Sequence, residues 1–238
     1  MKEATLKVKL HQGDLLAQEE GVVVVPVNNF FDTHLGDGIV CPRTIHGQFL
    51  EMCKTPPDEL SKLIHLDLEE YEVSGKTVER NSDGKVPELE RNRISYPLGS
   101  SVFLNSKDIG FFGDTEYLLL ALTEFDHNNK VIPNIGSTAG AIVKLLHDEM
   151  ASGLLPEVPN HYKYHLPLLG SGKGGLTEVE SLTLMLTSPP FCFLRDSVSN
   201  YGEAKSTFRT HFDINIFHRA KPEVVDELNK VIQNFGVY

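Results

Sequence analysis

The chain has 238 residues, of which 40% are hydrophobic and 23% are charged, and its formal net charge is −11. This length and hydrophobic content predict a folded chain with a sizeable core, and they exclude an intrinsically disordered protein. The strongly acidic balance argues against broad nucleic-acid binding, because that binding needs Lys and Arg to neutralise phosphates. A local anion site built from backbone N–H groups is still compatible with this charge.

Cysteine usage and the amino terminus bear on the compartment. Cys41, Cys53 and Cys192 are widely spaced and form no C-x-x-C pair, which favours reduced thiols in the cytoplasm. Residues Met1–Gln12 lack the apolar region of a secretory signal, and no run approaches the ~18 apolar residues of a membrane span. We expect a cytoplasmic chain, or the soluble domain of a protein whose membrane anchor is absent from this sequence.

Hydrophobic patterning predicts strands that alternate with helices. Ala4–Leu10 alternates apolar and polar residues, while Val22–Val27 is a continuous β-branched run typical of a strand buried on both faces. The other predicted elements are strands at Val102–Leu104, Tyr117–Phe125, His165–Leu169 and Asp213–Phe217, and helices at Arg43–Cys53, Ser137–Met150, Thr177–Leu186 and Pro222–Phe235. This order predicts a three-layer α/β domain with a mostly parallel sheet.

The segment Pro56–Arg93 differs from its surroundings because it is rich in charged residues. We interpret it as an exposed insertion with a hairpin turn at Ser82-Asp83-Gly84, rather than as a domain of its own. The expected organisation is therefore a single domain over residues 1–238, with a charged insertion at about 56–93.

A glycine-rich loop at residues 170–175, GSGKGG, follows a predicted strand and precedes a predicted helix. Glycines allow several backbone N–H groups to point at one ligand, and Thr177 with Glu180 matches a capping box at the start of the helix. The positive end of that helix adds to the attraction for an anion. We favour a phosphate-binding loop over a flexible strand-to-helix connection.

The same loop excludes one nucleotide-binding motif and leaves another open. It is not a Walker A loop, because Pro167 stands where a glycine is required and Gly174 follows the lysine. It matches G-x-G-x-x-G, and Asp196 lies about 20 residues further on, as in dinucleotide-binding folds. The loop comes late in the chain, however, and Pro189-Pro190 interrupts the approach to Asp196. A Rossmann oxidoreductase is a lesser alternative.

Three separated segments together resemble the macro domain family. They are LHQGDLL at Leu10–Leu16, VVVVPVNNFFDTHLGDGIV at Val22–Val40, and LPLLGSGKGGL at Leu166–Leu176. Macro domains are ADP-ribose-binding α/β/α sandwiches around a mixed, mostly parallel sheet of about six strands, and we expect this fold. The stretch THLGDGIVCPRTIHGQFLE, at residues 33–51, is most similar to the macro-like ligand-sensing domains of type II Thoeris antiphage effectors.

The resemblance implies a set of ligand-binding residues. An aspartate would accept from the adenine amino group beside a leucine, an asparagine would lie near the distal ribose, two glycine-containing loops would hold the pyrophosphate, and an aromatic ring would stack on adenine. In this sequence the aspartate is Asp14, with Leu15 beside it, the asparagine is Asn28 and the aromatic ring is that of Phe217. The first loop consists of Gly36, Asp37, Gly38 and Ile39, and the second consists of Ser171, Gly172, Lys173, Gly174, Gly175 and Leu176.

Two departures from the family pattern bear on the function. Asp37 stands between two glycines where hydrolytic macro domains have a further glycine, and Phe31 stands where they have a second asparagine. The resemblance thus implies a sensor of an ADP-ribose-derived nucleotide, such as histidine-linked ADP-ribose, whose cationic end Asp37 or a neighbouring acid would meet. The alternative is an ADP-ribosyl hydrolase in which Asn28 orients the ribose or a water.

We expect no catalytic residue, metal or cofactor for a sensor of this kind. His161 and His165 are four apart but lead into a strand, and H-E-x-x-H is absent. His46 fits either the lining of the first loop or a helix surface. The expected partner is the small nucleotide ligand, with self-association on ligand binding, no nucleic acid, and a membrane only through a segment outside this sequence.

Overall fold

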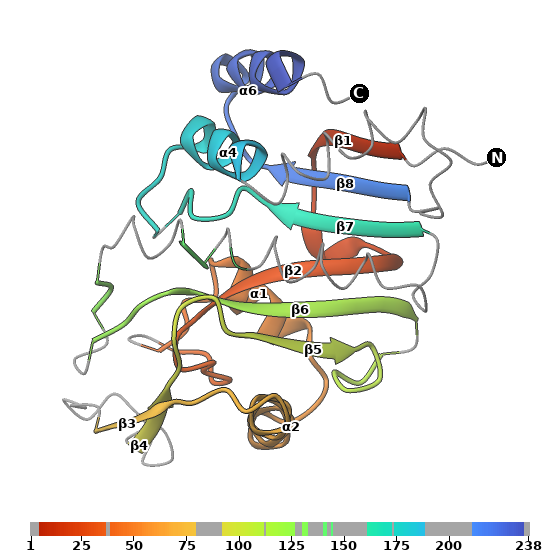
Figure 1. Cartoon of the computed structure of the whole chain (residues 1–238). Helices are drawn as coiled ribbons and strands as arrows, with labels where there is room; N and C mark the ends of the chain where they lie inside the picture. Colours follow the sequence, from red (N-terminus) through yellow and green to blue (C-terminus); the bar gives the residue numbers. More distant parts are fainter. Residues whose placement is uncertain are drawn as a thin grey trace.

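The computed structural model describes residues 5–36, 39–79, 92–111, 113–126, 130–132, 140–141, 144, 161–172, 174–188 and 211–235. Its centre is a six-stranded sheet in the order β1 (Thr5–Gln12), β8 (His211–His218), β7 (His161–Pro167), β2 (Glu20–Asn28), β6 (Asp114–Thr123) and β5 (Ser101–Asn105) (Figure 1). Among these strands β5 runs antiparallel to β6, and the other neighbours pair in parallel. This confirms the predicted mixed, mostly parallel sheet of about six strands.

Helices cover both faces of the sheet, which confirms the predicted three layers (Figure 1). One face carries α4 and α6, and the other carries α1 and α2. Their bounds are Ile45–Met52 for α1, Pro57–Glu70 for α2, Glu178–Thr187 for α4 and Pro222–Phe235 for α6.

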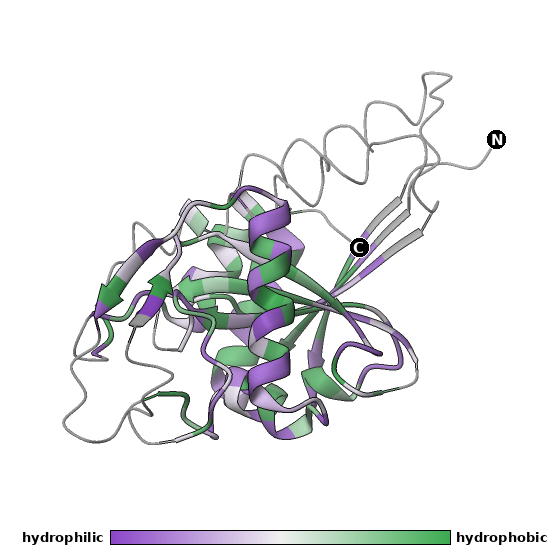
Figure 2. Cartoon of the chain, turned by 90° about the horizontal axis from the view of Figure 1, so that it is seen from below, coloured by the Kyte–Doolittle hydropathy of each residue, from purple (hydrophilic) through white to green (hydrophobic). Residues whose placement is uncertain are grey.

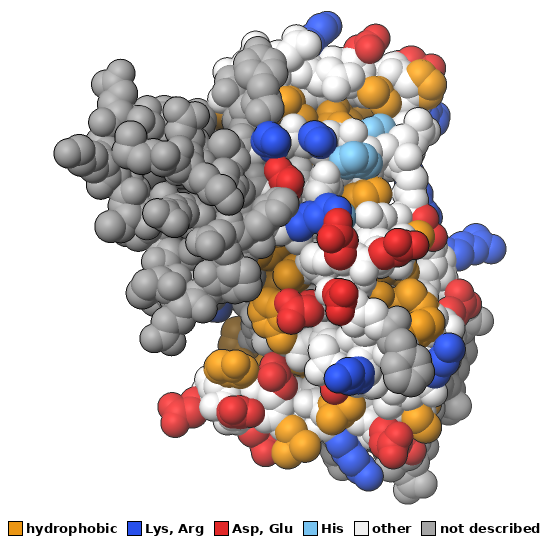
Figure 3. Space-filling model, turned by 90° about the vertical axis from the view of Figure 1, so that its right-hand side faces the viewer, with side chains coloured by type: hydrophobic (Ala, Val, Ile, Leu, Met, Phe, Trp, Pro, Cys, Tyr) orange, Lys and Arg blue, Asp and Glu red, His pale blue; other side chains and the backbone are white. Residues whose placement is uncertain are grey.

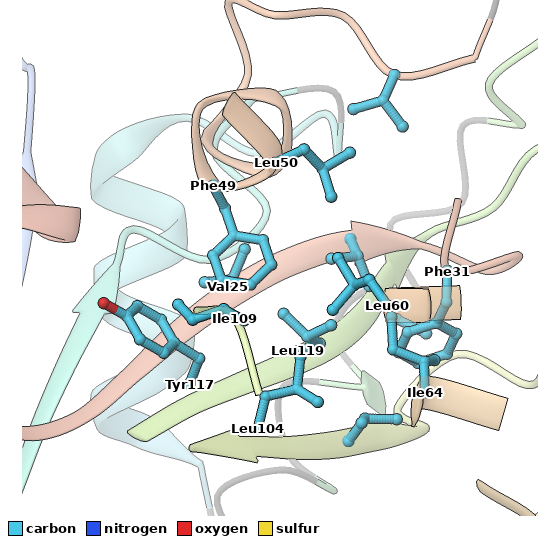
Figure 4. Packing of buried hydrophobic residues seen from close by; sticks show 14 of the residues in the cluster. Val25, Phe31, Phe49, Leu50, Leu60, Ile64, Leu104, Ile109, Tyr117 and Leu119 are labelled. Atoms are coloured by element: carbon cyan, nitrogen blue, oxygen red, sulfur yellow. The ribbon is translucent and has the colours of Figure 1, made fainter. Parts of the chain in front are cut away.

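Strand β2 lies inside the sheet, and its uninterrupted valines are buried on both sides. Because successive strand residues point to opposite faces, Val24 packs with Leu182 of α4, while Val25 packs with Phe49 of α1 and Leu60 of α2 (Figure 4). This is the physical reason for the continuous apolar run, which is typical of strands covered by helices on both faces.

The expectation of an exposed excursion after Pro56 is wrong for residues 57–70. These residues form α2, in which Leu60, Ile64 and Leu68 are buried against the sheet. Their spacing of four places them on one helix face, and most charged residues of α2 are exposed. Hydrophobic and hydrophilic residues accordingly alternate along this helix (Figure 2). The high charge of the segment conceals this stripe when only composition is considered.

Residues after α2 form a small antiparallel pair, β3 (Lys76–Glu79) with β4 (Asn92–Ser95). The predicted turn Ser82-Asp83-Gly84 between them lies outside the described residues. So do Pro189-Pro190, Cys192 and Asp196.

The remaining predicted elements overlap observed ones, with ends that differ by a few residues. Helix α6 has the predicted bounds, and β1 continues to Gln12 instead of ending at Leu10. Of the predicted helix Ser137–Met150, only residues 140–141 and 144 are described, and these are helical. No helix in the described part of the chain is long and apolar enough to cross a membrane.

Candidate ligand-binding site

A cavity of about 390 Å³ lies where β2, β7 and β8 end. These strands are parallel neighbours, so their carboxyl ends and the loops that follow them share one edge of the sheet. The turn after β1, the end of β6 and the start of α1 also contribute to the lining. A cavity of this size suits a small-molecule ligand. On the face drawn at the right of Figure 1, away from the carboxyl end of β7, acidic and basic side chains are interspersed (Figure 3).

The structure brings together residues from all the segments in which the sequence predicts ligand contacts. Asp14, Leu15, Asn28, Ile39, Ser171, Gly172, Gly174 and Phe217 line this one cavity. Gly36, Gly175 and Leu176 do not line it; Leu176 is buried in the core instead. Asp37, Gly38 and Lys173 lie outside the described residues.

The glycine loop is compact and depends on its glycines at particular positions. Gly170 and Gly175 have φ of 81° and 85°, a region that side chains disfavour. The Leu176 amide donates to the carbonyl oxygen of Gly170 at 3.0 Å, which closes the loop. A Cβ at Gly174 would lie 2.7 Å from the Gly170 backbone, whereas a Cβ at Gly172 would meet no atom within 4 Å.

The loop leads directly into α4, whose amino terminus has the predicted capping box. The Glu180 amide donates to the Thr177 hydroxyl oxygen at 3.2 Å, and the Thr177 amide donates to the Glu180 carboxylate at 2.8 Å. Hydrogen bonds from the Thr177 amide and from the Thr177 hydroxyl to the Glu180 carboxylate lower the pKa of this exposed carboxyl. The loop therefore enters a well-formed helix end, whose partial positive charge suits an anion.

Asp14 caps the short helix η1 (Leu15–Ala17). One of its carboxylate oxygens accepts from the Leu16 amide at 2.9 Å, and its side chain is exposed. A carboxylate has a second oxygen with further acceptor capacity. The cap therefore fixes the direction of the Asp14 carboxylate at the cavity edge without using all of its hydrogen-bonding capacity.

Phe217 lies between two histidine rings. Its centroid is 5.2 Å from that of His11, with an interplanar angle of 20°, and 5.8 Å from that of His165. Asn215 holds His11 by a 2.8 Å contact between His11 Nε2 and Asn215 Oδ1. These neighbours fix the orientation of the Phe217 ring in the cavity wall.

Asn28 shapes the bend that follows β2. Its side-chain oxygen accepts from the amides of Phe30 and Asp32, each at 3.2 Å, and its Nδ2 donates to the Asp32 carboxylate at 2.8 Å. Phe31, at the position of the family's second asparagine, has φ of 50° and is buried against Tyr96. The amide that lines the cavity is thus engaged in holding the backbone.

Asp32 is a buried carboxylate behind the cavity that the sequence analysis missed. It is 1% exposed, and the Nε of Arg93 lies 3.8 Å from it. Arg93 also donates from Nη1 to the hydroxyl of Ser61 in α2 at 3.0 Å. Asp32 and Arg93 therefore connect the bend after β2 to α2 through charged and polar groups. Sequence spacing does not reveal this connection.

His46, in the first turn of α1, is buried and lines the cavity. Of the two roles left open from the sequence, the structure supports the lining role. Burial lowers the pKa of His46 from 6.5 to about 4, although the charge and a backbone hydrogen bond of Asp32 act in the opposite direction. The ring is neutral near pH 7, so it offers one donor and one acceptor nitrogen.

Several further lining residues were missed because they follow the predicted motifs by a few positions. They are Cys41, Arg43, Thr44, Ile45, Gln48, Glu178, His218 and Arg219. The rule that ligands bind at carboxyl ends of parallel strands provides a signal for His218 and Arg219, which end and follow β8. Within the described residues, no cluster of His, Cys, Asp or Glu could hold a metal ion.

The strand order and the cavity define the class of protein. A Rossmann dinucleotide-binding sheet has the order 3-2-1-4-5-6, which this sheet lacks. The fold is that of macrodomains, as its similarity to three solved structures of the Oceanobacillus iheyensis macrodomain shows. An aspartate-to-alanine mutant has a TM-score of 0.54 at 13% identity, covering 98% of both chains. The form with ADP has 0.55 at 9%, covering 98% of this chain and 95% of that one. A glycine-to-valine mutant with ADPR has 0.53 at 12%, covering 98% and 97%.

A narrower family follows from the sequence comparison. The family model described as "Thoeris protein ThsA, Macro domain" matches residues 8–192, and the chain belongs to this family. It is also 26% identical over 169 residues to Thoeris protein ThsA of Bacillus amyloliquefaciens (strain Y2), covering 70% of this chain and 49% of that protein. The chain thus spans about half the length of this curated relative.

Proposed function

We propose that this domain binds an ADP-ribose-derived nucleotide signal, such as histidine-linked ADP-ribose, as the sensing part of a Thoeris-type antiphage defence protein. The observation that carries the proposal is the convergence of Asp14, Phe217 and the glycine loop on one cavity. They supply an acceptor, an aromatic ring and backbone N–H groups, which match adenine and pyrophosphate chemically.

The comparisons support the ligand class. The family is the ThsA macro domain, and two macrodomain structures of the same fold hold ADP and ADPR. The finer identity of the signal rests on the resemblance of residues 33–51 to type II Thoeris effectors. We further propose that the domain acts in the cytoplasm and self-associates when the ligand binds.

The bend after β2 favours sensing over hydrolysis. A hydrolase would need the Asn28 amide to orient the distal ribose or a water, but its oxygen and one N–H are engaged with Phe30 and Asp32. Phe31 supplies a buried ring in place of a second amide. We therefore expect a bound ligand to be released chemically unchanged.

Calorimetry with ADP-ribose and histidine-linked ADP-ribose tests the binding proposal. We expect heat with at least one ligand in the wild type and none in Gly172→Glu, which places a carboxylate in the cavity where a side chain meets no atom. Gly140→Glu is the matched control, because it adds the same charge in open space and does not line the cavity. Absence of heat with both ligands at millimolar concentration would contradict the proposal.

Product analysis decides between the sensor and the hydrolase. The ligand is recovered after prolonged incubation and its mass is measured, and ADP-ribosylated protein and O-acetyl-ADP-ribose are tested in parallel. Intact material supports sensing. Turnover that is lost in Asn28→Ala would instead establish the hydrolase. Light scattering with and without bound ligand tests self-association.

A further inference from the structure

Arg219 follows the end of β8 and reaches across the cavity wall to α1. It lies two residues after Phe217, its side chain is exposed, and it lines the cavity. Its Nη2 donates to Oε1 of Gln48 at 3.0 Å, and Gln48 Nε2 donates to the Arg43 carbonyl oxygen at 3.4 Å. The bond between Arg219 and Gln48 joins residues that are 171 positions apart in the sequence.

The partner of this guanidinium is a neutral amide. Arginine carries a permanent charge, and its hydrogen bonds to an oxyanion are about twice as strong as bonds between neutral groups. The Gln48 amide orients Arg219 in the wall without cancelling its charge. Arg43, whose backbone carbonyl accepts from Gln48, also lines the cavity and is exposed, so two arginines line the cavity in a chain whose net charge is −11.

We propose that Arg219 is an anion-binding residue of this cavity: on ligand binding its guanidinium leaves Gln48 and bonds an oxyanion of the ligand. The oxyanion is a phosphate, or a carboxylate at the end away from adenine. This inference rests on the proposed function, because it concerns the same cavity and ligand class, and it assigns a role that no motif in the sequence predicts.

The position of Arg219 complements that of the glycine loop. The loop leads into α4 on one face of the sheet, whereas Gln48 belongs to α1 on the other face. The loop offers backbone N–H groups, and Arg219 offers a charged planar fork from the α1 side of the cavity. An anion between them would gain donors from both sides.

Calorimetry with ADP, ADP-ribose, histidine-linked ADP-ribose and adenosine tests the role of Arg219. We expect Arg219→Ala to weaken the anionic ligands about ten-fold or more and to leave adenosine unchanged. Lys62→Ala, which removes an exposed cation of α2 outside the cavity, should leave every affinity unchanged. A loss with ADP assigns Arg219 to a phosphate, and a loss confined to histidine-linked ADP-ribose assigns it to the carboxylate. An equal loss with adenosine, or no loss with any ligand, would overturn the proposal.

A second measurement separates this inference from the proposed function. Inorganic pyrophosphate is titrated into ¹⁵N-arginine-labelled protein, and the side-chain signal of Arg219 is assigned by its disappearance in Arg219→Lys. We expect this signal to shift. If it shifts while ADP-ribose and its conjugate do not bind, the proposed function fails and the anion role stands. A signal that stays unchanged with pyrophosphate and also with histidine-linked ADP-ribose, in a protein that binds this conjugate, overturns the role of Arg219 alone.

Discussion

The side chain of Asn28 donates to the Asp32 carboxylate at 2.8 Å, across the tight bend that ends β2. The same side chain accepts from the Phe30 and Asp32 amides, so one residue satisfies three polar groups in a buried turn. Because buried polar groups are costly when unpaired, this network holds the bend after β2 in one conformation. It thereby fixes the part of the cavity wall that Asn28 forms.

Asp32→Asn should destabilise the domain by about 3 kcal/mol, because it removes the charge that Arg93 faces and leaves a buried cation with less compensation. Urea unfolding followed by circular dichroism measures the change. Asp58→Asn is the matched control, since Asp58 is exposed and lies 3.6 Å from His34; its effect should stay within about 0.5 kcal/mol. Similar small losses in both variants would show that the Asp32 network contributes little.

Gly174→Ala should destabilise the domain by about 1–3 kcal/mol, because the new Cβ would lie 2.7 Å from the Gly170 backbone. Gly172→Ala, two positions earlier in the same loop, meets no atom and should be close to neutral. Thermal unfolding of the two variants side by side gives the comparison. Equal melting temperatures would mean that the loop relaxes easily around Gly174.

Stability should fall as the pH is lowered from about 6.5 to about 4, the range between the ordinary and the folded pKa of His46. In this range the unfolded chain binds a proton that the buried ring excludes, so protonation favours unfolding by about 3 kcal/mol in total. Burial also lowers the pKa values of His65, His165 and His218, which adds to the same trend.

His46→Gln tests this assignment, because glutamine does not titrate. The free energy of unfolding is measured at several pH values in both proteins. The variant should lose less stability than the wild type between pH 6.5 and 4, with a remaining slope from the other histidines. Parallel curves would place the pH dependence elsewhere.

Phe217→Leu should weaken ADP-ribose and adenosine by a similar factor, about ten-fold, because stacking involves the base that both ligands share. This is the opposite pattern to Arg219→Ala, which should discriminate between charged and neutral ligands. His11→Ala should have a smaller effect of the same kind, since His11 stacks on Phe217 and holds its orientation. Calorimetry with both ligands separates the patterns, and unchanged affinities in Phe217→Leu would place adenine elsewhere in the cavity.

Features that depend only on neighbouring residues can be predicted from the sequence. The valine run of β2, the capping box at Thr177 and Glu180, and the glycine loop are local patterns whose physical meaning hardly depends on the rest of the chain. Alternation of strands and helices was sufficient for the layered fold, and the rule for strand ends was sufficient for the edge where the cavity lies.

Features that depend on distances between remote residues are visible only in the folded chain. Helix α2 is buried because its stripe of Leu60, Ile64 and Leu68 meets the sheet, which the charge of the segment does not reveal. Arg219 meets Gln48 because the folded chain brings the residue that follows β8 beside α1. Contacts between residues so far apart have no sequence period, so only the folded chain shows that Arg219 lines the cavity opposite the glycine loop.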